Sequence, residues 1–187
     1  MIMKQIAFGV HMPVMGFSTK EKDFLSRKQI LSFAQKAEFL GYDSLSVNDH
    51  IVFRTSWLDA ISTLSAVAAI TNKIKLGTSI LNIVIRNPVV CAKALSAIDI
   101  LSSGRLFAAG VGPGSYKGDY DVCGIPFEER WKRFTEALQI LRMVWNDVER
   151  TKSRRTSKEC GCKTIYTRIT SMKISLLQFH RRSYSYG

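Results

Sequence analysis

The sequence predicts an α/β fold in which parallel strands alternate with helices. Three observations predict it: short apolar runs of strand length, longer segments with apolar residues at the helical period, and regular alternation of the two up to about residue 147. Repeated βα units require parallel strands, because each helix returns the chain to the same end of the sheet. The expected strands are residues 5–10, 44–47, 75–81 and 106–111, and the expected helices are residues 22–40, 57–70, 87–102 and 127–145.

The first two units are recognised by their helices. The apolar positions of the first helix are Leu31, Ala34, Ala37 and the pair Phe39-Leu40, which follow the 3.6-residue period. Gly41 is placed to end this helix as a residue with positive φ. The short second strand leads into a polar turn, Asn48-Asp49-His50, before the second helix. That helix carries Leu58, Ile61, Leu64 and Ala68 on one face.

The third and fourth units have clearer boundaries. Asn87 and Pro88 supply an N-cap and a first-turn proline for the third helix, and Gly104 ends it. The fourth strand is followed by a glycine-rich loop and then by a helix with an apolar stripe. That stripe consists of Trp131, Phe134, Leu138, Leu141 and the pair Val144-Trp145. Four consecutive βα units fit either an open doubly wound sheet or a closed barrel.

The last 40 residues differ in composition from the rest. They contain 10 Lys or Arg against 2 Asp or Glu, and so hold two-thirds of the net charge of +12. We therefore divide the chain into a βα region, residues 1–147, and a basic tail, residues 148–187. Three interpretations of the tail remain open: an out-of-frame or disordered product, a basic arm for nucleic acid, and the end of an authentic half-barrel. Residues 174–177 are expected to form at most a short strand or helical turn.

Other classes of protein fit the composition poorly. No apolar run approaches the roughly 18 residues of a membrane span, and no signal peptide is recognisable, so a cytoplasmic location is expected. The four cysteines are Cys91, Cys123, Cys160 and Cys162, and their spacing predicts unpaired thiols. No metal site is expected, because no second thiol pair or histidine cluster accompanies Cys160 and Cys162.

Polar or glycine-rich segments follow each expected strand. They are His11-Met12-Pro13, Asn48-Asp49-His50, residues 78–82 and Gly112-Pro113-Gly114-Ser115. Because parallel strands end at one edge, these segments predict a site there. His50 is the best candidate for acid–base chemistry, with Asp49 placed to orient its ring; the alternative is a helix-capping pair.

The glycine-rich loop permits either a close approach of backbone to a planar ring or phosphate, or a plain βα turn. It does not match the G-x-G-x-x-G fingerprint, and the first βα turn has no such loop. The doubly wound dehydrogenase is therefore disfavoured.

Several motifs in order resemble the luciferase-like flavin monooxygenase superfamily. They are residues 39–50, residues 74–81, residues 86–90, residues 101–114 and residues 124–130. The resemblance covers about residues 5–147. It implies a TIM-like (β/α) barrel, truncated here to about the first four βα units, that binds FMN or the deazaflavin coenzyme F-420. It implies hydride transfer between the cofactor ring and a small organic substrate, with oxygen activation in the FMN members.

The resemblance also assigns residues to the site. Asp49 and His50 fall where members place groups near the cofactor ring, with His50 as the expected catalytic residue. The expected cofactor-binding residues are Asp49, Thr78, Ser79, Ile80, Gly112, Gly114 and Ser115. A non-prolyl cis peptide is implied between Ser79 and Ile80. Some deazaflavin-dependent members have an acidic residue after the glycine-rich turn. Ser115 and Tyr116 stand there, which argues against a sugar-phosphate substrate.

Four strands leave two open edges, and this predicts self-association and weak cofactor binding by a monomer. An alternative function from another class is a non-catalytic half-barrel, which binds a nucleotide-like ligand or a partner chain through its open edge. Neither membrane nor nucleic acid is the expected partner.

Overall fold

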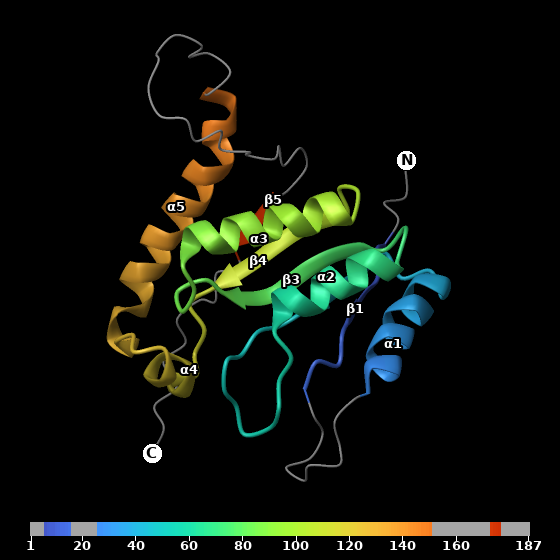
Figure 1. The fold of residues 1–187 in the computed structure, drawn as a ribbon, viewed down its shortest axis with the longest axis horizontal. Helices are drawn as coiled ribbons and strands as arrows, with labels where there is room; N and C mark the ends of the chain where they lie inside the picture. Colours follow the sequence, from blue (N-terminus) through green and yellow to red (C-terminus); the bar gives the residue numbers. More distant parts are fainter. Residues whose placement is uncertain (1–5, 16–25, 151–172, 177–187) are drawn as a thin grey trace.

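The computed structural model describes residues 6–15, 26–150 and 173–176, with side chains over 6–15 and 26–145. These residues form one parallel sheet of five strands in the order β1-β2-β3-β4-β5 (Figure 1). The strands are β1 (Gly9–His11), β2 (Ser44–Val47), β3 (Lys75–Asn82), β4 (Leu106–Gly112) and β5 (Lys173–Leu176). Each strand pairs with the one before it in the chain, as in the wall of a barrel and unlike a doubly wound sheet.

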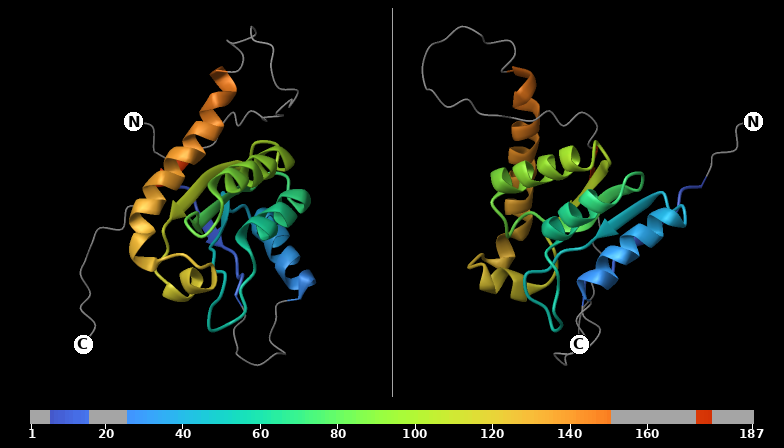
Figure 2. Two further views of the ribbon diagram at one scale, coloured as in Figure 1. Left: turned by 60° about the vertical axis from the view of Figure 1, so that its left-hand side comes forward. Right: turned by 45° about the vertical axis from the view of Figure 1, so that its right-hand side comes forward.

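The main helices lie in chain order on one face of the sheet (Figure 2). They are α1 (Arg27–Phe39), α2 (Ala60–Ile70), α3 (Pro88–Leu101) and α5 (Arg130–Arg150), while the short α4 (Lys117–Val122) follows β4. The prediction of a parallel α/β fold of the barrel type is confirmed.

Side-chain caps explain where the helices begin. Ser26 and Gln29 form a capping box, so α1 starts at Arg27; residues 22–25 of the expected helix lie outside the described residues. Asp59 accepts a hydrogen bond from the Ser62 backbone, so α2 starts three residues later than expected. Asn87 caps α3 ahead of Pro88, as predicted.

Three elements differ from expectation. β1 spans Gly9–His11 rather than residues 5–10, because its pairing starts at Gly9 opposite Ser44. The expected fourth helix begins as a 3-10 turn, η1 (Phe127–Glu129), and α5 then continues to Arg150. Helix α4 lies between the fourth strand and the expected fourth helix, where the sequence predicts only a loop.

The basic tail contributes a strand to the sheet. β5 pairs in parallel with β4, with Ala108 opposite Lys173 and Val111 opposite Leu176. The expected short strand near residues 174–177 is therefore present, and it occupies the place of a fifth barrel strand.

The core lies between the sheet and its helices. Its largest fully buried side chains include Leu45, Leu76 and Leu106 from the strands, and Leu64 and Leu95 from the helices. No helix in the described part of the chain is long and apolar enough to cross a membrane.

Glu38 of α1 joins the first helix to the start of β3. Its carboxylate accepts hydrogen bonds from the backbone N–H groups of Asn72, Lys73 and Ile74. Burial opposes ionisation of Glu38, but the three N–H donors and the nearby Arg105 outweigh it and lower its pKa. The ionised carboxylate therefore stabilises the folded chain.

This stabilisation should depend on pH. A lowered folded pKa makes it fully present above the unfolded pKa of about 4.5, and it is lost as pH falls through the folded value. In urea unfolding between pH 3 and pH 6, Glu38→Gln should be less stable than wild type at pH 6. The gap should shrink towards pH 3, and a gap independent of pH would contradict the assignment.

Candidate functional site

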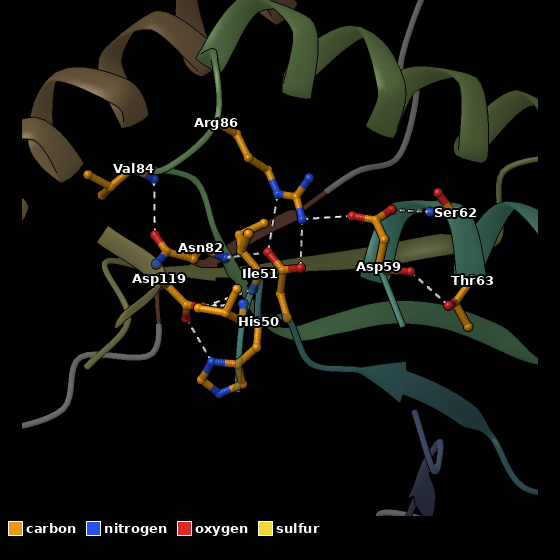
Figure 3. Close-up of polar contacts among 11 residues, drawn as sticks. His50, Ile51, Asp59, Ser62, Thr63, Asn82, Val84, Arg86 and Asp119 are labelled. Atoms are coloured by element: carbon orange, nitrogen blue, oxygen red, sulfur yellow. Dashed lines mark hydrogen bonds and ion pairs between the residues drawn. The ribbon is translucent and has the colours of Figure 1, made fainter. Parts of the chain in front are cut away.

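The carboxyl ends of the strands bring together the polar segments that the sequence singles out. The loop after β2 and the short helix α4, which follows β4, meet through a hydrogen bond between His50 and Asp119. The Nδ1 atom of His50 lies 2.7 Å from Oδ2 of Asp119, a residue of α4 (Figure 3). His50 is partly buried, with 22% of its side chain exposed, whereas Asp119 is almost fully buried.

Asp119 also fixes the backbone of the loop that carries His50. Its Oδ1 atom accepts hydrogen bonds from the N–H groups of Ile51 and Val52, both at 2.9 Å. An ionised carboxylate can only accept hydrogen bonds, so the hydrogen of the His50–Asp119 bond lies on Nδ1 of His50. The ring therefore presents Nε2 as its second functional nitrogen.

The expectation that Asp49 orients His50 is wrong. Asp49 is buried, and its Oδ1 accepts a 2.7 Å bond from Arg86. Arg86 also bonds Asp59 at 2.7 Å (Figure 3). Asp49 accepts a further bond from the backbone N–H of Asn82 at the end of β3. Its charge is therefore committed to a structural ion pair. The alternative of a capping Asp-His pair fails as well, because Asp59 caps α2.

Burial lowers the pKa of the Arg86 guanidinium, but Asp49 and Asp59 outweigh it and raise that pKa. In the same way the pKa of Asp59 is lowered, because hydrogen bonds from Ser62 and the charge of Arg86 outweigh burial. These groups stay charged and hold the second and third strand ends together.

The peptide bond between Ser79 and Ile80 is cis, which confirms the expectation from the resemblance. Pairing between β3 and β4 skips Ile80, since Ser79 lies opposite Gly110 and Leu81 lies opposite Val111. Ser79 is exposed and Ile80 is partly exposed, so this bulge is presented at the edge. Thr78 is buried, and its hydroxyl donates to the Gly110 carbonyl at 2.8 Å.

The glycines of β4 and its loop allow close packing against β3. A Cβ atom on Gly112 would lie 2.5 Å from Cδ1 of Ile80, and one on Gly114 would lie 2.6 Å from Nδ2 of Asn82. Gly114 also has a φ of +69°, which favours glycine. Gly112 therefore leaves room for the Ile80 side chain and Gly114 for that of Asn82, while Ser115 is exposed beyond them.

Tyr120 fixes the glycine-rich loop by a hydrogen bond to its backbone. Its hydroxyl donates to the Pro113 carbonyl, and the side chain is fully buried. Burial raises the pKa of Tyr120, although a hydrogen bond with Asn82 opposes the shift. The phenol thus remains a neutral donor, a role that the sequence pattern gave no reason to expect.

Aromatic side chains surround His50. Its ring centroid lies 4.7 Å from that of Phe53, 4.7 Å from that of Trp57 and 5.9 Å from that of Tyr116. Phe53 and Tyr116 also contact each other, with centroids 5.1 Å apart. The imidazole therefore lies between the buried Asp119 carboxylate and these three aromatic rings.

Within residues 6–15 and 26–145, no three His, Cys, Asp or Glu side chains are grouped to hold a metal ion. Cys91 and Cys123 are free thiols, and burial raises the pKa of Cys91 to about 11. Cys160 and Cys162 lie outside the described residues.

Comparison with known proteins identifies a family. A family model described as luciferase-like monooxygenase matches residues 8–163. An F-420-dependent glucose-6-phosphate dehydrogenase of Amycolatopsis mediterranei is 32% identical over 140 residues, which are 70% of this chain and 41% of that protein.

Solved structures show the same fold. The monooxygenase RslO1 from Streptomyces bottropensis aligns with a TM-score of 0.64 and 25% identity, covering 75% of this chain and 43% of its own. A type II Baeyer-Villiger monooxygenase of Pseudomonas putida in complex with FMN aligns with a TM-score of 0.67 and 18% identity, covering 91% and 50%. This chain thus spans about two-fifths to one-half of the proteins it matches.

Proposed function

The chain belongs to the luciferase-like monooxygenase family, and from this we propose that its carboxyl-edge site serves a flavin- or deazaflavin-dependent oxidoreductase. The reaction is hydride transfer between the cofactor ring and a small organic substrate. The observation that carries the proposal is the buried Asp119 carboxylate bonded to His50 at the end of the sheet where the cis bulge also lies. The cofactor is coenzyme F-420 or FMN, as named for the relatives.

The residues present fit a planar ring. The edge offers an apolar bulge at Ile80, next to the exposed Ser79, and an exposed Ser115 after the glycine-rich loop. We propose that Ile80 supports the ring and that Ser79 and Ser115 hydrogen-bond its polar rim. Asp49 acts through Arg86 and the Asn82 backbone, and Gly112 and Gly114 act by leaving room for Ile80 and Asn82. Thr78 is likewise a packing residue.

His50 moves the proton that accompanies the hydride. The bound cofactor supplies the hydride acceptor or donor, and the protein supplies orientation and proton transfer. With its Nδ1–H donated to Asp119, the neutral His50 ring accepts a proton at Nε2 from a substrate hydroxyl, or returns it in the reverse direction. Asp119 stabilises the imidazolium that forms.

Self-association through the sheet edges is part of the proposal. Within the described residues, β1 and β5 each pair on one side only, so their outer backbone groups are open to another strand. A second copy of the chain is the proposed partner, and the associated form is proposed to bind cofactor more tightly than the monomer.

The full chain should be titrated with F-420 and with FMN, and its mass measured by light scattering in the same samples. We expect one of the two to bind, more tightly in the associated form. In that complex, loss of the oxidised cofactor's absorbance on adding substrate reports hydride transfer.

His50→Gln should lower kcat by about 10²-fold or more, the scale of general acid–base catalysis. Asp119→Asn should lower it about tenfold or more by favouring the wrong tautomer of His50.

Asp121→Asn is the matched control, because Asp121 is an exposed carboxylate on the same short helix, paired with Lys117. It should leave kcat unchanged. Ligand binding without any absorbance change across substrates would instead favour the non-catalytic half-barrel. Binding of neither cofactor by any associated form would refute the proposed function.

A further inference from the structure

The loop after β2 carries three exposed apolar side chains directly after His50 in the chain, and the ring of one of them, Phe53, contacts His50. Ile51, Val52 and Phe53 are 41%, 36% and 41% exposed, although each is large and apolar. Their backbone is not free to turn them inward, because Asp119 holds the N–H groups of Ile51 and Val52. Exposed apolar side chains that cluster beside a reactive group mark a surface for a ligand.

Tyr116 extends this surface from the opposite loop. Its ring contacts both Phe53 and His50, and it folds over Gly118, where a Cβ atom would lie 2.6 Å from the Tyr116 ring. Gly118 therefore permits the position of Tyr116. We call the surface of Ile51, Val52, Phe53 and Tyr116 the apolar lip.

Within the described part of the chain, most charges near the apolar lip are matched among themselves. Asp119 is bonded to His50, Arg86 is bonded to Asp49 and Asp59, and Lys117 is paired with Asp121. A phosphate or carboxylate on a substrate is normally met by cations that are not already engaged. The exposed Arg54 beside Phe53 is the cation to test for that role.

We propose that the apolar lip binds the hydrocarbon part of an uncharged substrate and so sets the substrate class of the site. The inference rests on the proposed function, because it takes His50 as the group next to the reacting atoms. It assigns to this chain a substrate different in chemistry from the sugar phosphate named for its curated relative. Phe53 is the specificity-determining residue, since it joins His50, Trp57 and Tyr116.

The test uses the full chain without cofactor and two probes, cyclohexanone and glucose 6-phosphate. The chain has three histidines, so the ring-proton NMR signal of His50 can be assigned by its loss in His50→Gln. Cyclohexanone should shift the His50 signal, and glucose 6-phosphate should not. Phe53→Ser should weaken cyclohexanone binding about tenfold, and Phe53→Leu, which keeps the apolar surface, should stay close to wild type.

Phe39→Ser is the matched control, because Phe39 is 87% exposed at the end of α1 and is not part of the site. It should bind cyclohexanone as wild type does. The proposal is overturned if cyclohexanone leaves the His50 signal unmoved, or if Phe53→Ser binds as well as wild type. It is also overturned if glucose 6-phosphate shifts the signal and Arg54→Ser abolishes that shift. Cofactor binding is measured separately, so failure of the apolar lip and failure of the proposed function give different results.

Discussion

Replacing Arg105 by Lys is expected to lower the free energy of unfolding by about 3 kcal/mol. The guanidinium of Arg105 makes five hydrogen bonds. Its partners are the carbonyls of Ser102, Ala68, Thr71 and Ile74 and the hydroxyl of Thr71, at 2.8–2.9 Å. It thereby ties the end of α2 to the starts of β3 and β4. A lysine ammonium has three donors on one atom and cannot span this set, so buried carbonyls lose their partners.

The control is Arg133→Lys, since Arg133 is an exposed arginine paired with Glu129 one helical turn away. That change should cost less than about 0.5 kcal/mol, as surface pairs do. Urea unfolding at pH 7 and a fixed protein concentration measures both variants. Equal stability of Arg105→Lys and wild type would show that the five hydrogen bonds of the guanidinium add nothing to the free energy of unfolding.

Replacing Gly110 by Ala is expected to destabilise the chain by about 3 kcal/mol, at the upper end of what overpacking costs. A Cβ atom on Gly110 would lie 2.3 Å from the backbone oxygen of Thr78. The obstacle is backbone in a paired strand, so relief requires β3 and β4 to separate where Thr78 also bonds Gly110.

Gly112→Ala is the informative comparison. There the added Cβ atom would lie 2.5 Å from Cδ1 of Ile80, the far end of a side chain that can rotate away. We expect it to cost about 1 kcal/mol, below the backbone clash of Gly110→Ala, and to weaken cofactor binding by displacing the bulge. Calorimetry gives the stabilities and cofactor titration gives the affinities. The reverse order of stabilities would contradict this reading of the strand pair.

The periodic part of the fold could be predicted because its signals are local. β2 and the Asn87 cap of α3 follow from apolar spacing and capping residues within a few positions. The start of α2 differs from the expected residue 57, because the apolar residues Trp57 and Leu58 precede the cap at Asp59. The six residues of α4 are too few for a period to show.

The partners within the site could not be predicted, because they are distant in sequence. Asp49 adjoins His50 in the chain, yet it faces Arg86, 37 residues away. The residue that bonds His50 is Asp119, separated from it by 69 residues and placed by α4. The cis bond at Ser79–Ile80 is predicted only by the resemblance to the family, because residue spacing contains no sign of it.

The bond between Asp119 and His50 also orders the events of synthesis. The loop that carries His50 leaves the ribosome 69 residues before Asp119 does, and two strands and two helices, α2, β3, α3 and β4, lie between them. Until α4 emerges, the carboxylate that bonds His50 and the backbone of Ile51 and Val52 is missing, so strands β1 to β4 are complete before these contacts can form. The exposed apolar side chains of Ile51, Val52 and Phe53 therefore emerge well before the carboxylate that fixes the backbone of this loop.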